Sequence, residues 1–159
     1  MHILILLLIL FLPSVAIGGT TCFENAGKLY NIDPRLLRAM AIVESKMKSN
    51  AIRYNRNAKG DILTRDFGLM QINEKHIKNL KEQGIVKNEN ELIIYPCLNI
   101  YVGASILEKH FSKCGVNWQC LGTYNAGFNK NNSLKRIDYA KKIFSVYKKL
   151  QNLKSTPQT

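Results

Sequence analysis

Apolar residues recur at three- and four-residue spacing through most of this 159-residue chain, which predicts a mainly helical protein. The expected helices cover residues 21–30, 34–45, 74–83, 96 to at least 111, 118–124 and 138–153. Between them, Asn50 to Asp66 is the segment that fits a loop or short strands. The length favours a single domain, because no repeat, linker or low-complexity segment divides a chain that is long enough to bury a core.

The helix expected over 34–45 carries the first candidate for chemistry. Leu37, Met40 and Ala41 share one face of this helix, and the next position on that face is Glu44. A carboxyl group that ends an apolar stripe is expected to be partly desolvated, which raises its pKa towards the range of a general acid. The alternative is a glutamate that turns to solvent or pairs with Lys48.

The chain begins with an apolar run from Ile3 to Leu12 that is too short to span a bilayer as a helix. The small residues Ala16 and Gly18 follow it, where the cleavage site of a signal peptide is expected. An uncleaved N-terminal anchor is the alternative. The expected organisation is a secretory signal peptide over 1–18, a folded domain over 19–154 and a flexible tail over 155–159.

All four cysteines follow the expected signal peptide, and an even number of them is typical of disulfides in a small exported domain. Four cysteines allow three pairings. We favour Cys22–Cys97, which would join the first helix to a central one, with Cys114–Cys120 closing a short loop.

The formal net charge of +12 indicates an anionic partner, such as an envelope polymer, an acidic peptide or nucleic acid. The lysines are dispersed, however, and no motif for reading nucleic-acid bases is present. We therefore expect the charge to aid solubility and substrate encounter, without nucleic acid as a partner, and we expect a monomer. No metal site is expected, because His76 and His110 lack ligand spacing and should be ordinary helix-surface residues.

Three motifs occur in order along the chain: Glu44-Ser45, Gly68-Leu69-Met70-Gln71-Ile72-Asn73 and Tyr124-Asn125-Ala126-Gly127. Together they resemble the soluble-lytic-transglycosylase (SLT) group, in particular the small exported enzymes that accompany type III and type IV secretion, conjugation and pilus assembly. The resemblance spans roughly Cys22 to Leu150. It implies a lysozyme-like fold, α+β with a minimal β region, and an enzyme that cleaves peptidoglycan in the periplasm. It also implies a partner in such an apparatus and no cofactor.

On this resemblance Glu44 is the catalytic acid of a lytic transglycosylase. It would protonate the leaving oxygen of the β-1,4 bond and then act as base towards the 6-hydroxyl of MurNAc, which gives a 1,6-anhydro end. Ser45 would hydrogen-bond near the acid, or alternatively cap the helix. Lys46 and Met47 depart from the family, which usually has glycine and another small or aromatic residue there.

The resemblance also implies a set of residues that contact the sugar. Tyr124 would orient the catalytic glutamate, or alternatively be a packed core residue, and Asn125 would face the substrate. Gln71 and Asn73 carry amides suited to N-acetyl and hydroxyl groups, although Asn73 also fits a helix cap. Met70 would line a sugar subsite or pack in the core. The candidate substrate-binding residues are Ser45, Gly68, Met70, Gln71, Asn73, Tyr124, Asn125, Ala126 and Gly127.

A second carboxylate, Asp66, leaves two types of reaction open, transglycosylation and hydrolysis. We interpret Asn55-Arg56-Asn57 and Lys59-Gly60-Asp61 as turn-rich. Asn55-Arg56-Asn57 and the stretch from Asp66 to Asn73 also resemble the animal c-type lysozymes around their second catalytic aspartate. Asp66 would then stabilise or capture the glycosyl cation. Asp61 competes for this role, and a structural loop aspartate is the other alternative. A hydrolase using Glu44 and Asp66, or a non-catalytic accessory that binds glycan or an apparatus, therefore stands beside the transglycosylase.

Overall fold

The computed structural model describes residues 18–153, so the expected tail and all of the expected signal peptide except Gly18 lie outside the described residues. The first half contains α1 (Gly18–Tyr30), α2 (Pro34–Ser45), β1 (Ile52–Arg56), β2 (Ile62–Phe67), β3 (Ile72–Asn73), the 3-10 helix η1 (Glu74–His76) and α3 (Ile77–Glu82). The second half contains α4 (Glu91–Ile94), α5 (Pro96–Cys114), α6 (Trp118–Leu121), α7 (Thr123–Ala126), the 3-10 helix η2 (Lys130–Asn132) and α8 (Ser133–Asn152). The expected fold class, mainly α with a minimal β region, is confirmed.

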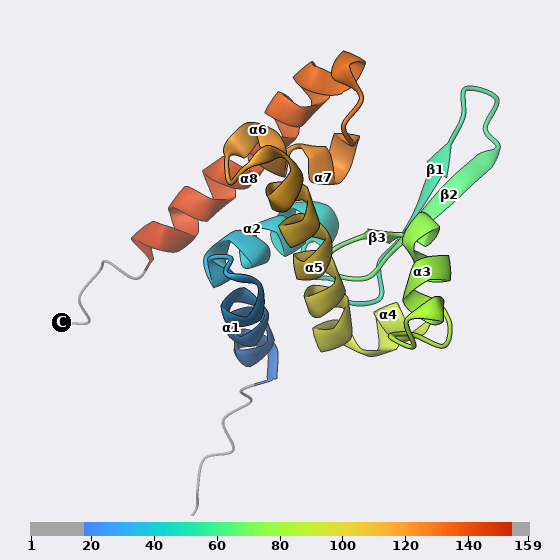
Figure 1. Cartoon of the computed structure of the whole chain (residues 1–159), viewed down its shortest axis with the longest axis horizontal. Coiled ribbons are helices and arrows are strands. Elements are labelled where there is room, and N and C mark those ends of the chain that lie inside the picture. Colours follow the sequence, from blue (N-terminus) through green and yellow to red (C-terminus); the bar gives the residue numbers. More distant parts are fainter. Residues whose placement is uncertain (1–17, 154–159) are drawn as a thin grey trace, which may run out of the picture.

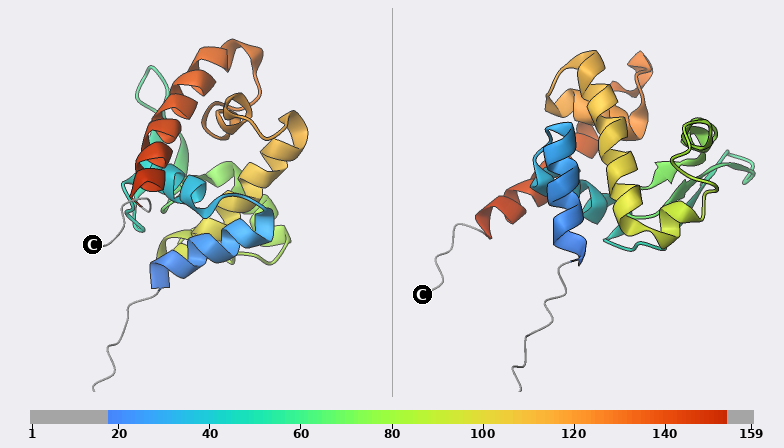
Figure 2. Two further views of the ribbon diagram at one scale, coloured as in Figure 1. Left: turned by 90° about the vertical axis from the view of Figure 1, so that its left-hand side faces the viewer. Right: turned by 60° about the horizontal axis from the view of Figure 1, so that its bottom comes forward.

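Helix α5 lies at the centre of the molecule (Figures 1 and 2). The helices α1 and α2 lie on one side of it, and the small sheet with α3 lies on the other. The long helix α8 packs across α2, and α1 packs against both α2 and α5. The helical part and the sheet are therefore two walls joined through α5. None of the described helices is long and apolar enough to cross a membrane.

Helix α2 ends at Ser45, directly after Glu44. Asp33 caps its start, with the side chain accepting a hydrogen bond from the backbone N–H of Arg35 at 2.8 Å. At the other end Lys46 and Met47 both adopt positive φ values, 55° and 62°. This left-handed conformation favours glycine, which explains why the family usually places glycine after the Glu-Ser pair. The turn sends the chain directly from Glu44 towards β1.

The sheet places polar side chains on one face. Strands β1 and β2 form an antiparallel hairpin in which Arg53 pairs with Asp66 and Asn55 with Thr64, and β3 sets Asn73 opposite Asp66. Residues directly opposite each other in a sheet share a face, so these five side chains project together. The face matters because it carries the second carboxylate.

The turn of the hairpin lies in the second of the two turn-rich stretches. Asn55 and Arg56 belong to β1, so only Asn57 of the first stretch is in the turn, whereas Lys59-Gly60-Asp61 lies within it. The reversal begins at Asn57, whose side-chain oxygen accepts hydrogen bonds from the backbone N–H groups of Lys59 and Asp61, both at 2.9 Å.

Other boundaries also differ from those expected. The sequence did not indicate β3 or α4, because a strand of two residues and a helix of four are too short for periodicity to show. Helix α8 begins at Ser133 rather than near Asp138. The favoured disulfide pairing is confirmed: Cys22–Cys97 joins α1 to α5, and Cys114–Cys120 joins the end of α5 to α6.

The buried side chain of Asn99 holds the turn between β2 and β3. Its amide nitrogen donates to the backbone oxygens of Phe67 (2.8 Å) and Leu92 (3.0 Å), and its side-chain oxygen accepts from the N–H of Met70 at 2.7 Å. Gly68 has a φ of 74°, and a Cβ there would collide with Asn99. The glycine of the second motif is thus required by α5 packing against the turn.

We expect Asn99→Ala to lower the free energy of unfolding by about 3 kcal/mol, because three buried backbone groups lose their partner. Chemical denaturation followed by circular dichroism measures this change. Asn79→Ala, at an exposed position on α3, is the control and should change stability by less than about 0.5 kcal/mol. Equal effects of the two substitutions would contradict the role of Asn99.

Candidate active site

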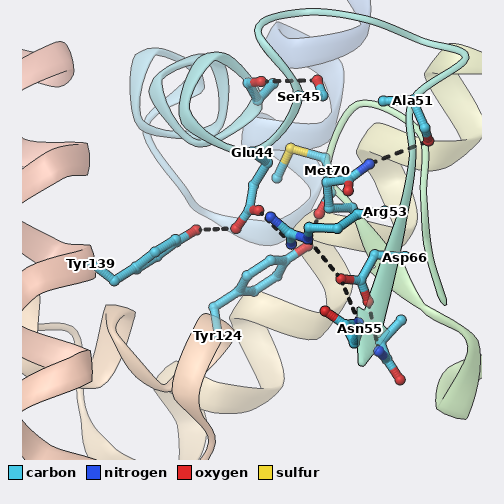
Figure 3. Close-up of polar contacts among 12 residues, drawn as sticks. Glu44, Ser45, Ala51, Arg53, Asn55, Asp66, Met70, Tyr124 and Tyr139 are labelled. Carbon is cyan, nitrogen blue, oxygen red and sulfur yellow. Dashed lines mark hydrogen bonds and ion pairs between the residues drawn. The ribbon is translucent and has the colours of Figure 1, made fainter. Parts of the chain in front are cut away.

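Glu44 lies in the last turn of α2 with only 3% of its side chain exposed. Its Oε1 accepts a hydrogen bond from the hydroxyl of Tyr139 on α8 at 2.7 Å, and its Oε2 contacts Arg53 at 3.2 Å (Figure 3). Burial raises the pKa of Glu44, and the contacts with Tyr139 and Arg53 only partly offset this effect. The apolar stripe of α2 thus ends in a desolvated carboxyl group, as the sequence indicated.

The guanidinium of Arg53 connects the two carboxylates. Its Nη2 lies 3.2 Å from Glu44 Oε2, and its Nε lies 3.0 Å from Asp66 Oδ2 (Figure 3). Arg53 was not among the residues expected at the site. Its place could have been found from strand alternation, because Arg53 and Asn55 are two residues apart and share the face that carries Asp66.

Asp66 has a different environment from Glu44. Its carboxylate accepts hydrogen bonds from Arg53 Nε (3.0 Å), Asn55 Nδ2 (3.0 Å) and Asn73 Nδ2 (2.6 Å), and 7% of the side chain is exposed. It belongs to β2, not to a loop. Asp61 lies in the exposed turn of the hairpin and pairs with Asn57, so it is not part of this cluster.

A cleft of about 730 Å³ opens beside these carboxylates. The sheet and η1 line one side of it, and α2, α5 and α7 with the residues that follow α7 line the other. The cleft is lined by Glu44, Arg53, Asn55, Asp66, Gln71, Ile72, Asn73, Lys75, His76, Ile106, His110, Thr123, Tyr124, Asn125, Gly127 and Phe128. Its lining of carboxylates, amides and a few rings is suited to a polar ligand such as a sugar chain.

Five of the nine expected substrate-binding residues line the cleft: Gln71, Asn73, Tyr124, Asn125 and Gly127. The other four do not line it, each for a visible reason. Ser45 donates to the Ala41 carbonyl at 3.1 Å, which fits the helix-end alternative. Met70 is fully buried, and Gly68 packs against Asn99. The carbonyl of Ala126 accepts from Asn132 at 2.7 Å.

The contacts of Tyr124 fit its packed-core alternative, and the contact with Glu44 is made by Tyr139. The resemblance implied that Tyr124 orients the glutamate, but its hydroxyl donates to the backbone oxygen of Met70 at 3.0 Å. The hydroxyl bonded to Glu44 is that of Tyr139. Tyr139 shares a helical face with Ile143 and Val146, which predicts that it turns inward but not that its hydroxyl bonds to Glu44.

The two amide residues of the second motif are held in place by the protein. Gln71 adopts a φ of 49°, rare for a residue with a side chain, and its Nε2 donates to the carbonyl of Gly68 at 2.8 Å. Asn73 both donates to Asp66 and caps η1 through the N–H of Lys75 at 3.1 Å. The helix-cap interpretation of Asn73 is confirmed, and its contact with the sugar stays a prediction.

His110 corrects another expectation. It was expected to be an ordinary surface residue, yet it is half-buried in the wall of the cleft, with Nδ1 2.7 Å from the Thr123 hydroxyl. Its ring packs against Phe128 at a centroid distance of 4.8 Å, and burial lowers its pKa. Within residues 18–153, no group of three or more His, Cys, Asp and Glu side chains is placed to hold a metal ion.

Comparison with known proteins gives a family match over most of the chain. Residues 21–146 match the model of the transglycosylase SLT domain. The chain is 49% identical over 144 residues to a "peptidoglycan-binding-like protein" of Escherichia coli O157:H7, covering 91% of this chain and 86% of that protein. It is 40% identical over 147 residues to invasion protein IagB of Salmonella typhimurium, covering 92% and 88%.

One further relative and one solved structure are also similar to this chain. The chain is 35% identical over 143 residues to protein IpgF of Shigella flexneri, covering 90% of this chain and 88% of that protein. An inactive mutant of the lytic transglycosylase Slt from Pseudomonas aeruginosa superposes with a TM-score of 0.63 at 20% identity. The match covers 86% of this chain but only 25% of the Pseudomonas chain, and it shows a shared fold.

We expect Glu44→Gln to raise the thermal stability of the protein at pH 7, because the folded-state pKa of Glu44 lies above its ordinary value of 4.5. The stabilising contribution of protonated Glu44 is complete below that ordinary value and is lost as the pH rises through the folded-state pKa. The increase in Tm should be about 2–4 °C at pH 7 and should vanish towards pH 4. Thermal unfolding by calorimetry checks this, with the exposed Glu24→Gln as a control that shows no such pattern.

We expect Tyr139→Phe to raise the pKa of Glu44 further, because it removes a hydrogen bond that stabilises the ionised carboxylate. Tyr124→Phe should leave that pKa closer to the native value, since its hydroxyl bonds to Met70. The pH titration of the Glu44 carboxyl carbon by NMR distinguishes the two variants. A larger shift in Tyr124→Phe would assign the orienting role to Tyr124.

Proposed function

Because the chain belongs to the transglycosylase SLT domain family and is a peptidoglycan lytic transglycosylase, we propose that it cleaves the β-1,4 bond between MurNAc and GlcNAc and leaves 1,6-anhydro ends. The observation that carries this proposal is the buried Glu44, with its raised pKa, opening into a polar cleft. A carboxyl group of this kind retains the proton that a glycosidic leaving oxygen requires.

In the first step the carboxyl group of Glu44 gives its proton to the glycosidic oxygen. The bond between MurNAc C1 and that oxygen breaks, GlcNAc leaves with a 4-hydroxyl, and positive charge develops on the MurNAc ring. Glu44 becomes a carboxylate in the same step. The hydroxyl of Tyr139 and the guanidinium of Arg53 then stabilise its new charge, since both favour the ionised form.

In the second step the Glu44 carboxylate takes the proton from the 6-hydroxyl of the same MurNAc. The oxygen of that hydroxyl forms the new bond to C1, which closes the 1,6-anhydro ring and returns Glu44 to its protonated state. One residue therefore serves as acid and then as base, and the same wall of the cleft faces both oxygens.

Asp66 contributes electrostatic stabilisation of the sugar cation. Before proton transfer, the charges of Asp66 and Arg53 balance each other. After Glu44 has given up its proton, two carboxylates face one guanidinium, and the local excess of one negative charge matches the positive sugar. Asp66 is held by three donors, so it needs no rearrangement to act.

Hydrolysis is the second candidate reaction. The observation that favours it is the Arg53 bridge, which places Glu44 and Asp66 in one cluster with two distinct environments. In a hydrolase, water attacks C1 in place of the 6-hydroxyl and leaves a reducing end. A non-catalytic accessory is less well supported, because such a protein has no use for a desolvated carboxyl group at the cleft.

We further propose that the protein is exported to the periplasm and opens the wall locally for a secretion, conjugation or pilus apparatus. The expected signal peptide and the two disulfides support export, since disulfides persist in oxidising compartments. The name "invasion protein" of the 40% identical Salmonella relative is consistent with service to such an apparatus. A subunit of that apparatus is the expected partner.

Mass spectrometry of the muropeptides released from purified peptidoglycan tests the reaction. We expect anhydro ends from the mature protein, no release by Glu44→Gln, and release reduced by about 10²-fold by Asp66→Asn. Reducing ends would establish the hydrolase instead. Release by Glu44→Gln would show that the acid lies elsewhere, and full activity of Asp66→Asn would remove Asp66 from the mechanism.

A further inference from the structure

A second hollow, of about 380 Å³, lies beside the cleft on the side of α8. Glu44, Arg53 and Asn125 line both spaces, so the two meet at the catalytic acid. The remaining lining residues of the hollow are Val43, Lys135, Asp138, Tyr139 and Lys142. A glycan chain that is cut at Glu44 extends to both sides of it, and this hollow lies directly beside that point.

The lysines of the hollow come from one face of α8. Lys135, Tyr139 and Lys142 are spaced by four and three residues, the spacing that aligns side chains along a helix. Tyr139 anchors this face to Glu44 by its 2.7 Å hydrogen bond, which fixes the lysines close to the acid. Both lysines are exposed, so their ammonium groups are accessible from the hollow.

The charges of these lysines are not used within the fold. Among residues 18–153, the ion pairs involve neither Lys135 nor Lys142. Arg53 is committed to Glu44 and Asp66, so it does not serve an outside anion on this side. Besides Glu44, the hollow contains one carboxylate, that of Asp138. The two ammonium groups of Lys135 and Lys142 therefore exceed its negative charge by one.

We propose that this hollow, defined by Lys135, Lys142 and Asp138, binds a carboxylate of the stem peptide carried by a MurNAc residue next to the cut bond. This inference rests on the proposed function, because it assigns a further part of the same polymer. Stem peptides extend from the sugar chain and carry free carboxylates, which ammonium groups recognise. The site makes the enzyme selective for glycan that still carries its peptides over bare glycan.

Two soluble substrates test this selectivity: uncross-linked glycan strands with their stem peptides, and the same strands after an amidase has removed the peptides. We expect the double variant K135E/K142E to lower kcat/KM about tenfold on the peptide-bearing strands, and less than about twofold on the bare strands. The loss should shrink in high salt, because the contacts are close to the surface.

The matched control is K148E/K149E, which makes the same change of charge on the last turns of α8, outside the hollow. It should leave the ratio of the two kcat/KM values unchanged. An equal loss on both substrates in K135E/K142E, or an equal change of the ratio in the control, would overturn the proposal and assign the effect to general charge.

Binding separates this proposal from the proposed reaction. The Glu44→Gln protein, which should not turn over, is titrated with peptide-bearing strands, with and without K135E/K142E. Weaker binding on charge reversal supports the peptide site even if the products prove to be those of a hydrolase. Equal binding overturns the site, whereas a wild-type protein that cleaves neither substrate would overturn the proposed function.

Discussion

The pairing of one guanidinium with two carboxylates is the constraint on which the site depends. Arg53 reaches Glu44 on the helical side and Asp66 on the sheet side, so it holds the two walls of the cleft at a fixed relation. A buried carboxylate without partners is costly, and both carboxylates are almost fully buried, whereas the guanidinium between them is 45% exposed. The two carboxylates therefore depend on Arg53 for a charged partner, and this shared partner fixes how the helical side and the sheet side of the cleft meet.

The rest of the fold supports that pairing from behind. Tyr139 brings α8 to the acid, and Asn99 brings α5 to the turn that follows Asp66. Both contacts are made by buried polar atoms in the core between elements that are far apart in sequence. The position of the acid is thus set by three helices and a hairpin together, which is why no single motif specifies it.

The sequence predicted the features that depend on helical periodicity and those that belong to a family motif. The stripe of Leu37, Met40 and Ala41 indicated both the buried face of α2 and the desolvation of Glu44, because a helical period is regular over three turns. The family motifs indicated Gln71, Asn73, Tyr124 and Asn125, which the structure brings to one cleft.

The features that sequence could not give depend on tertiary contacts. Strand alternation can place Arg53 beside Asp66, but local spacing contains no information on its contact with Glu44 or on that of Tyr139, 95 residues away. Gly68 was expected at the sugar, and Met70 at the sugar or in the core, and the structure packs Gly68 against Asn99 of α5 and buries Met70 fully. One motif can therefore contribute some residues to the cleft and others to the core, and only the packing of the folded protein distinguishes them.

The bond between Cys22 and Cys97 encloses α2, the whole sheet and both carboxylates in one covalent ring. Chain-entropy arguments give a ring of this size about 4 kcal/mol of stabilisation, a large share of what a domain has. In a reducing compartment the ring is open, and the walls that Arg53 joins are held by noncovalent contacts alone. The redox state of its surroundings thus sets how firmly Glu44 and Asp66 are held together.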